Sequence, residues 1–127
     1  MSIKKIIIGL TLSMLLASGV ASADWDDVYY CQMTNYAEIT LDGEKKNWKL
    51  EKFQLKIDRA KTSILFGKSG YFSGSVMPLT EGRYWPSQDS WNAMTTFSML
   101  YLHKGKFLYS SVFSEDSTTI SADCDKF

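Results

Sequence analysis

The sequence predicts an all-β fold, a small antiparallel up-and-down meander that closes into a barrel of seven or eight strands. Runs that alternate apolar and polar residues recur about every ten residues after residue 23, and Gly, Asn, Asp or Ser separate them. Helical periodicity is nearly absent from the same part of the chain. Closure is predicted by the two cysteines, Cys31 and Cys124, which lie near its opposite ends.

Residues 1–23 have the organisation of a secretory signal peptide. Lys4 and Lys5 form a positive region, Ile6–Val20 is apolar, and Ala21-Ser22-Ala23 is a small-residue cleavage site. A retained membrane anchor is the alternative, but the apolar stretch is shorter than the roughly 20 residues that cross a bilayer. We therefore expect cleavage after Ala23 and a periplasmic or secreted protein.

The remaining residues, 24–127, are expected to form a single β domain stapled by one disulfide. The whole chain is 45% hydrophobic, 14% aromatic and 22% charged, which is typical of a globular protein and not of a disordered one. Its 14 basic and 14 acidic residues balance, and it has one His and two Cys. These counts argue against a basic nucleic-acid-binding face, a zinc ribbon and an iron–sulfur cluster, so we expect no metal and no cofactor.

We expect Cys31 and Cys124 to pair, because the destination of an exported chain is oxidising. Two free thiols or an intermolecular bridge are the alternatives. A disulfide requires Cα atoms within about 7 Å, and these cysteines fall in the first and last expected strands. A meander whose terminal strands touch has closed into a barrel. A β-sandwich also brings chain ends together and stays as an alternative.

Five strands are expected before the longest loop: Val28–Met33, Ala37–Leu41, Trp48–Ile57, Thr62–Phe66 and Gly70–Met77. Asp42-Gly43 marks a turn after the second of them. In the third, the apolar parity changes between Leu50 and Phe53, which predicts a bulge that keeps Trp48 on the inner face.

Three strands are expected after that loop: Ala93–His103, Phe107–Phe113 and Thr118–Cys124. Lys104-Gly105 is expected at a hairpin tip, and the next turn at 114–117. The outward positions at the end of the chain are polar: Asp125, Asp123, Ser121 and Thr119. A membrane-spanning strand needs apolar residues there, so we expect no membrane span after signal cleavage.

The loop from Met77 to Asn92 is the strongest candidate for a binding segment. It contains both prolines of the chain and concentrates four side chains that commonly anchor partners: Arg83, Tyr84, Trp85 and Trp91. The alternative is a lid that folds back and plugs one barrel end with its indoles. Burial of Trp85 and Trp91 decides between the two.

Short features of the sequence are similar to those of the small periplasmic lysozyme inhibitors. They are the Tyr29–Cys31 opening of the first strand, Ser69-Gly70-Tyr71 and a cysteine near the end of the chain, Cys124. The resemblance implies a disulfide-bearing β-barrel that inhibits a hydrolase, and Tyr71 joins the binding candidates. The likeness covers only these positions, and the spacing around Ser69-Gly70 departs from the inhibitory loop of that family.

The leading hypothesis is a non-enzymatic, exported and monomeric binding domain that contacts a small ligand or a protein through the loop at the barrel rim. A lysozyme-type hydrolase inhibitor is the alternative, and a structural periplasmic protein is a further one. Catalysis is not expected, because His103 stands beside a turn and no serine lies in a G-x-S-x-G elbow.

Overall fold

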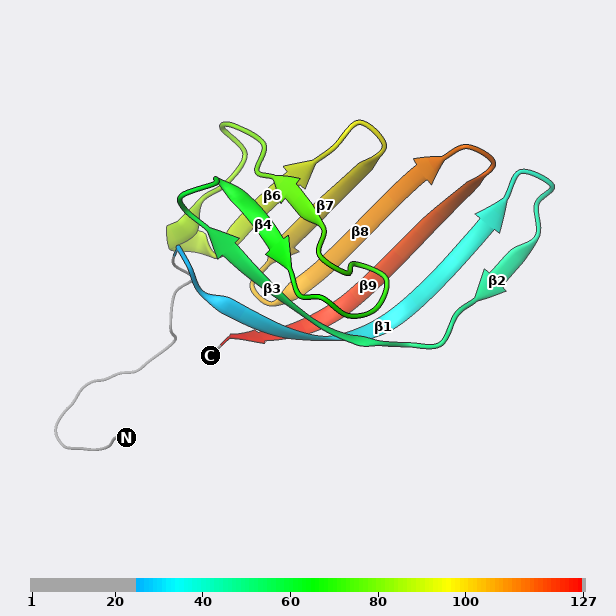
Figure 1. Cartoon of the computed structure of the whole chain (residues 1–127), viewed down its shortest axis with the longest axis horizontal. Coiled ribbons are helices and arrows are strands. Elements are labelled where there is room, and N and C mark those ends of the chain that lie inside the picture. Colours follow the sequence, from blue (N-terminus) through cyan, green and yellow to red (C-terminus); the bar gives the residue numbers. More distant parts are fainter. Residues whose placement is uncertain (1–24, 127) are drawn as a thin grey trace, which may run out of the picture.

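The computed structural model describes residues 25–126 and confirms the all-β prediction (Figure 1). The strands that it contains are β1 (Val28–Thr40), β2 (Lys45–Asn47), β3 (Lys52–Asp58), β4 (Ser63–Phe66), β5 (Val76–Pro78), β6 (Ser90–Met94), β7 (Ser98–His103), β8 (Lys106–Phe113) and β9 (Asp116–Lys126). In this described range, the helical element is a single 3-10 turn, η2 (Pro86–Gln88). The signal peptide expected at residues 1–23 lies outside it.

All strands belong to one antiparallel sheet with the order β5-β4-β3-β1-β9-β8-β7-β6. β2 pairs with the second half of β1, while β3 pairs with the first half. The two ends of the sheet meet where Leu79 pairs with Ala93 and the Thr80 amide donates to the Asn92 carbonyl (2.8 Å). The sheet is therefore nearly closed into a barrel, as predicted.

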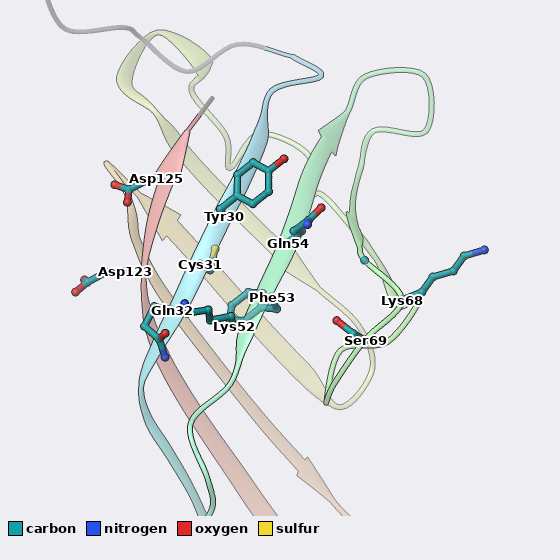
Figure 2. Close-up of a pocket in the computed structure, with 11 residues that line it drawn as sticks. Tyr30, Cys31, Gln32, Lys52, Phe53, Gln54, Lys68, Ser69, Asp123 and Asp125 are labelled. Atoms are coloured by element: carbon teal, nitrogen blue, oxygen red, sulfur yellow. The ribbon is translucent and has the colours of Figure 1, made fainter.

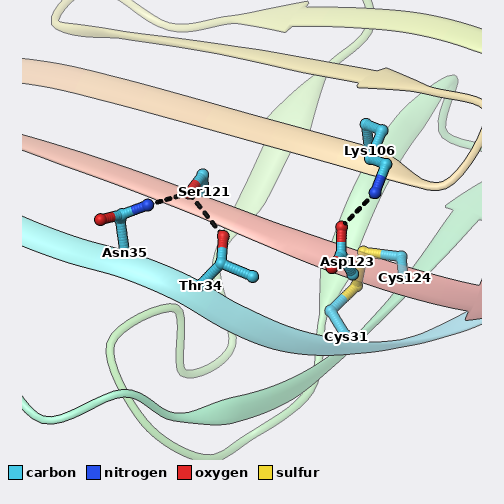
Figure 3. A network of polar contacts seen from close by, with 7 residues as sticks. All are labelled: Cys31, Thr34, Asn35, Lys106, Ser121, Asp123 and Cys124. Carbon is cyan, nitrogen blue, oxygen red and sulfur yellow. Dashed lines mark hydrogen bonds and ion pairs between the residues drawn. A yellow bond between two sulfur atoms is a disulfide. The ribbon is translucent and has the colours of Figure 1, made fainter.

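The predicted disulfide joins β1 to β9 (Figure 3). Cys31 and Cys124 are directly paired in the register of the two strands, and their Cα atoms are 4.0 Å apart. Both side chains are buried on the inner face. Closing a loop of this length stabilises the fold by about 4–5 kcal/mol on the chain-entropy model. Such a bridge fits an exported protein, because cytosolic thiols are kept reduced.

The core is built from the residues of one parity in each strand, because successive side chains of a strand point to opposite faces. Its largest fully buried side chains are Tyr29, Met33, Leu55, Ile57, Ile64, Trp91, Leu100, Leu102 and Ile120. The rings of Phe53, Phe66, Phe72 and Phe107 pack together inside the barrel with centroids 4.4 to 6.3 Å apart. The closed part of the barrel is thus filled by its own side chains.

β1 is one long strand, so the prediction of two strands at Val28–Met33 and Ala37–Leu41 is wrong. Its pairing with β9 is interrupted by a bulge between Met33 and Asn35. The bulged residues stay in contact with β9, because Thr34 Oγ1 and Asn35 Nδ2 bond to Ser121 Oγ at 2.7 and 3.1 Å (Figure 3). The extra residue moves Tyr36 onto the inner face.

The predicted strand Trp48–Ile57 is correct only from Lys52 onward. Trp48 and Leu50 are exposed rather than turned into the core. This segment runs beside β1 without regular pairing: the Trp48 amide donates to the Tyr36 carbonyl (2.8 Å), and the Met33 amide donates to the Glu51 carbonyl (3.0 Å). The expected bulge of this strand occurs in β1 instead.

Two further boundaries differ from the prediction. The single strand expected at Ala93–His103 is a hairpin of β6 and β7, whose turn is closed by the Thr95 amide and the Ser98 carbonyl (2.9 Å). The strand expected at Gly70–Met77 is mostly turns, and only its end forms β5. The turn of the β6–β7 hairpin contains neither Gly nor Pro, so the sequence carries no signal for it.

No helix in the described part of the chain has the length and apolarity that a membrane crossing requires.

Candidate functional site

The sequence-derived binding candidates lie at two different ends of the barrel. Arg83, Tyr84, Trp85 and Trp91 are at the end where β6 begins and where the Lys104 amide donates to the Asp89 carbonyl (2.9 Å). Tyr71 lies at the end where β6 finishes, because it lines a cavity together with Thr95. The structure therefore does not bring Tyr71 together with the other four.

The loop end is sealed by aromatic rings. Trp91 is fully buried, and its ring stacks on Tyr84 (centroids 6.2 Å apart) and meets Trp25 edge to face (5.3 Å). Asp89 Oδ1 accepts hydrogen bonds from the Trp91 indole (3.2 Å) and the Tyr29 hydroxyl (2.8 Å). Trp91 is thus part of the core, and its ring is not exposed at the surface for contact with a partner.

Trp85 and Arg83 remain exposed at this end. The backbone of Trp85 is fixed by two hydrogen bonds with Ser90, at 2.8 and 3.2 Å, and η2 follows directly. Trp85 has 48% of its surface exposed. Both residues are thus exposed on the same loop, whose backbone is held by hydrogen bonds at Trp85.

At the opposite end, strands β1, β8 and β9 continue beyond the short strands β3 and β4 (Figure 1). A larger group of aromatic rings lies at this end. We call Tyr36, Trp48, Tyr71 and Tyr109 the aromatic platform. Adjacent rings are in contact: Tyr36 to Trp48 at 6.2 Å, Tyr36 to Tyr71 at 5.5 Å and Tyr71 to Tyr109 at 5.8 Å. The four rings come from β1, the segment after β2, the β4–β5 connection and β8.

The platform is positioned by local features of the sequence. The bulge in β1 turns Tyr36 inward, opposite Ile120 of β9. Trp48 is held by its indole, which donates to Glu38 Oε1 (3.1 Å). Tyr71 is held by its backbone amide, which donates to Glu51 Oε1 (2.9 Å). Both anchoring groups are carboxylates, which make stronger hydrogen bonds than neutral acceptors.

Hydroxyl groups gather at the Tyr71–Tyr109 end of the platform. The hydroxyls of Tyr71 and Tyr109 are 3.5 Å apart, with Ser111 and Thr118 next to them on the inner faces of β8 and β9. Burial and the Tyr109 hydroxyl raise the pKa of Tyr71, while Thr118 and Ser111 act in the opposite direction. Burial, followed by the charges of the nearby glutamates, also raises the pKa of Tyr36. A tyrosine is neutral at physiological pH without any shift, and the raised pKa of Tyr36 and Tyr71 lies still further from that pH.

A cavity of about 320 Å³ adjoins the platform. It is lined by Tyr71, Phe72, Ser75, Val76, Met77, Thr95, Ser98 and Tyr109. Tyr71 and Tyr109 belong to both the platform and the cavity wall. Its volume is at the lower end of the range for ligand pockets. A ligand lying on the platform can thus place one group into the barrel mouth.

A second hollow, of about 900 Å³, lies on the outer face of β1 and β3 (Figure 2). Most of its lining consists of exposed polar side chains, and Lys68 extends away from it into solvent. Asp123, on its edge, is already paired with Lys106 at 2.7 Å. This hollow is larger than the cavity at the platform, but it lacks buried polar groups directed into it.

The structure shows no arrangement typical of a metal centre. Within residues 25–126, no three or more His, Cys, Asp or Glu residues gather in a way that could hold a metal ion. His103 stacks on Tyr101 (5.9 Å), and its Nδ1 is buried without a hydrogen-bond partner. A catalytic imidazole is normally oriented by a carboxylate or a hydroxyl, which His103 Nδ1 does not have.

Sequence reasoning found only Tyr71 among the platform residues. The signal for Tyr36 was the pair of polar residues Thr34-Asn35, which breaks the alternation of the first strand. Trp48 was expected in the core, and Tyr109 gave no signal beyond its strand.

Comparison with known proteins identifies no relative, because no family model, curated protein or solved structure matches the chain.

Proposed function

We propose that this protein is an exported, monomeric and non-enzymatic binding domain, periplasmic or secreted, that holds its ligand on the aromatic platform. The observation that carries the proposal is the gathering of rings from four separate segments beside a cavity. Aromatic side chains supply most of the contact energy in many binding sites, and they lose little conformational freedom on binding.

The platform is already ordered for binding. Trp48 has 48% of its surface exposed, although its indole is fixed by Glu38 and its backbone by Tyr36. Holding a large apolar ring half in water is unfavourable unless something else covers it. A fixed and exposed ring reduces the entropy that a ligand must remove on binding.

The experiment compares two tryptophans that are equally exposed. Trp48 and Trp85 each have 48% of their surface exposed, but Trp85 lies on the loop at the other end. Tryptophan fluorescence and thermal shift are measured with a panel of oligosaccharides, fatty acids and haem for the wild type, W48A and W85A. We expect one class of probe to bind the wild type and W85A, and W48A to lose that binding. Silence of the wild type towards the whole panel, or loss in W85A alone, contradicts the proposal.

Inhibition of a hydrolase is the second candidate, and the exposed pair of Arg83 and Trp85 supports it. Arg and Trp are the residues most often found at the centre of tight protein interfaces. If the protein inhibits a lysozyme-type hydrolase through this loop, R83A and W85A abolish inhibition and W48A preserves it. An unchanged inhibition constant in the R83A/W85A double variant excludes this role for the loop.

A further inference from the structure

We propose that the ligand of the aromatic platform is a neutral carbohydrate chain. This inference rests on the proposed function and names the chemical class that the platform recognises. A sugar ring presents an apolar face of C–H groups and a rim of hydroxyls that both donate and accept hydrogen bonds. A complementary site therefore needs exposed aromatic faces together with uncharged hydroxyls.

Trp48 and Tyr36 supply the aromatic faces. Their ring planes differ by only 34°, and their centroids are 6.2 Å apart, so the two faces are similarly inclined and adjacent. Tyr71 stands at 74° to Tyr36 and forms a wall beside it. The two neighbouring aromatic faces of Trp48 and Tyr36, with Tyr71 beside them, fit an elongated ligand that contains more than one sugar ring.

The hydroxyl cluster supplies the polar contacts. Tyr71 and Ser111 keep part of their surface exposed, and each carries a hydroxyl, a group that can donate one hydrogen bond and accept others. Tyr109 and Thr118 are buried, and they adjoin the Tyr71 hydroxyl. Glu38 is fixed by the Trp48 indole and has further lone pairs that can accept from a ligand hydroxyl. A fatty acid or another apolar ligand would cover these groups without bonding to them, which costs free energy.

The charges near the platform favour an uncharged ligand. Glu38 is directly opposite Lys46 in the register of β1 and β2, so both signs occur at this edge. Tyr36 and Tyr71 are neutral at physiological pH, as an unperturbed tyrosine also is, and burial raises the pKa of both further. An anionic ligand would meet Glu38 and Glu51, and a cationic ligand would meet Lys46.

A quaternary ammonium group is the other ligand that aromatic rings and carboxylates attract. Its usual site is a cage in which several ring faces surround the cation. Here Tyr36 and Tyr71 meet at 74°, and Tyr71 and Tyr109 meet at 70°, with ring edges filling the space between them. The geometry therefore favours stacking on a surface over enclosure in a cage.

The test measures binding of defined probes by isothermal titration calorimetry. The probes are cellohexaose, chitohexaose, maltohexaose, phosphocholine and palmitate. We expect at least one hexasaccharide to bind, W48A to weaken it about tenfold or more, and W48F to restore most of the affinity. W85A is the matched control and leaves the affinity unchanged. Circular dichroism melting confirms that each variant is folded.

E38Q separates a sugar from a cation. Glutamine keeps an acceptor oxygen for a hydroxyl but removes the charge that a cation needs, so a sugar loses little affinity and phosphocholine loses most of it. Binding of phosphocholine or palmitate, with no hexasaccharide bound and with sensitivity to W48A, overturns the carbohydrate assignment and leaves the platform as a binding site. Hexasaccharide binding that W48A does not change overturns both the assignment and the proposed function.

Discussion

At the scale of single residues, Gly70 sets the position of Tyr71. Its φ of +75° lies in the left-handed region, which residues with a side chain rarely adopt. A Cβ at this position would lie 2.5 Å from Glu51 Oε1, the atom that accepts the hydrogen bond from the Tyr71 amide. One glycine thus allows both the turn and the contact that anchors the platform.

G70A is expected to cost more stability than G74A. Gly74 lies in the same connection with a φ of +65°, but nothing is within 4 Å of its added Cβ. Both variants carry the backbone strain, about 1–3 kcal/mol, and only G70A also displaces Glu51 from the Tyr71 amide, which adds about 1 kcal/mol. Urea denaturation of the two variants measures the difference. Equal losses would show that the Glu51 contact contributes nothing.

Alkaline pH is expected to destabilise the fold through its buried tyrosines. Burial and the hydrogen bond to Asp89 raise the pKa of Tyr29 above its ordinary value of 10.0, and the pKa of Tyr71 is raised as well. Above about pH 10 the unfolded chain loses these protons and the folded chain keeps them, so stability falls as pH rises. Urea denaturation between pH 8 and 11 measures this. A free energy of unfolding that stays constant above pH 10 would contradict the assignment.

At the scale of elements, the sheet has one strong and one weak junction. β1 and β9 are paired over nearly their whole lengths and carry the disulfide. Among the residues that the structure describes, the seam that closes the barrel is held by the Leu79–Ala93 bridge and the hydrogen bond from Thr80 to Asn92. Local opening begins where few contacts must be broken.

Hydrogen exchange is expected to follow this difference. The amides of Ile120 and Ala122, within β9, exchange only on global unfolding, while the amide of Thr80, which donates across the seam to Asn92, exchanges through local opening at a much lower free energy. Amide exchange followed by NMR gives each value separately. Equal protection at the seam and in β9 would mean that the barrel is closed as firmly there as elsewhere.

Strands with clear alternation and glycine-marked turns were predictable from the sequence. Thr62–Phe66 and Phe107–Phe113 match β4 and β8 within a residue, and the tip at Lys104-Gly105 is correct. The β6–β7 turn was missed because no turn residue marks it, and alternation then ran through both strands. Alternation of apolar and polar residues predicts that a strand forms. Where no turn residue marks its end, only pairing with neighbouring strands determines where the strand ends.

The candidate site was less predictable than the fold. Trp48 was assigned to the core because its parity fitted a bulged strand, yet the bulge is at Thr34, on the neighbouring strand. The rings of the platform are far apart in the sequence and meet only after β1, β8 and β9 pair. Exposure of an aromatic ring depends on which elements cover it, and a single sequence does not state that.

At the scale of the whole molecule, the disulfide decides how stable the barrel is, because it ties the first strand to the last across 93 residues. The C31A/C124A double variant is expected to lose about 2–5 kcal/mol of unfolding free energy while keeping its β-type circular dichroism at 25 °C. Urea denaturation of the oxidised wild type and the variant measures the loss. An unchanged midpoint would show that strand pairing alone holds the ends together.

The central claim is that the aromatic platform, and not the loop at the opposite end, receives the ligand. Its most direct test is an NMR titration that follows the indole N–H signals of the four tryptophans with the hexasaccharide that binds best. We expect the Trp48 signal to move in proportion to occupancy, because its indole lies at the edge of the platform, and the Trp85 signal to stay in place. Movement of Trp85 with a stationary Trp48 would contradict the account.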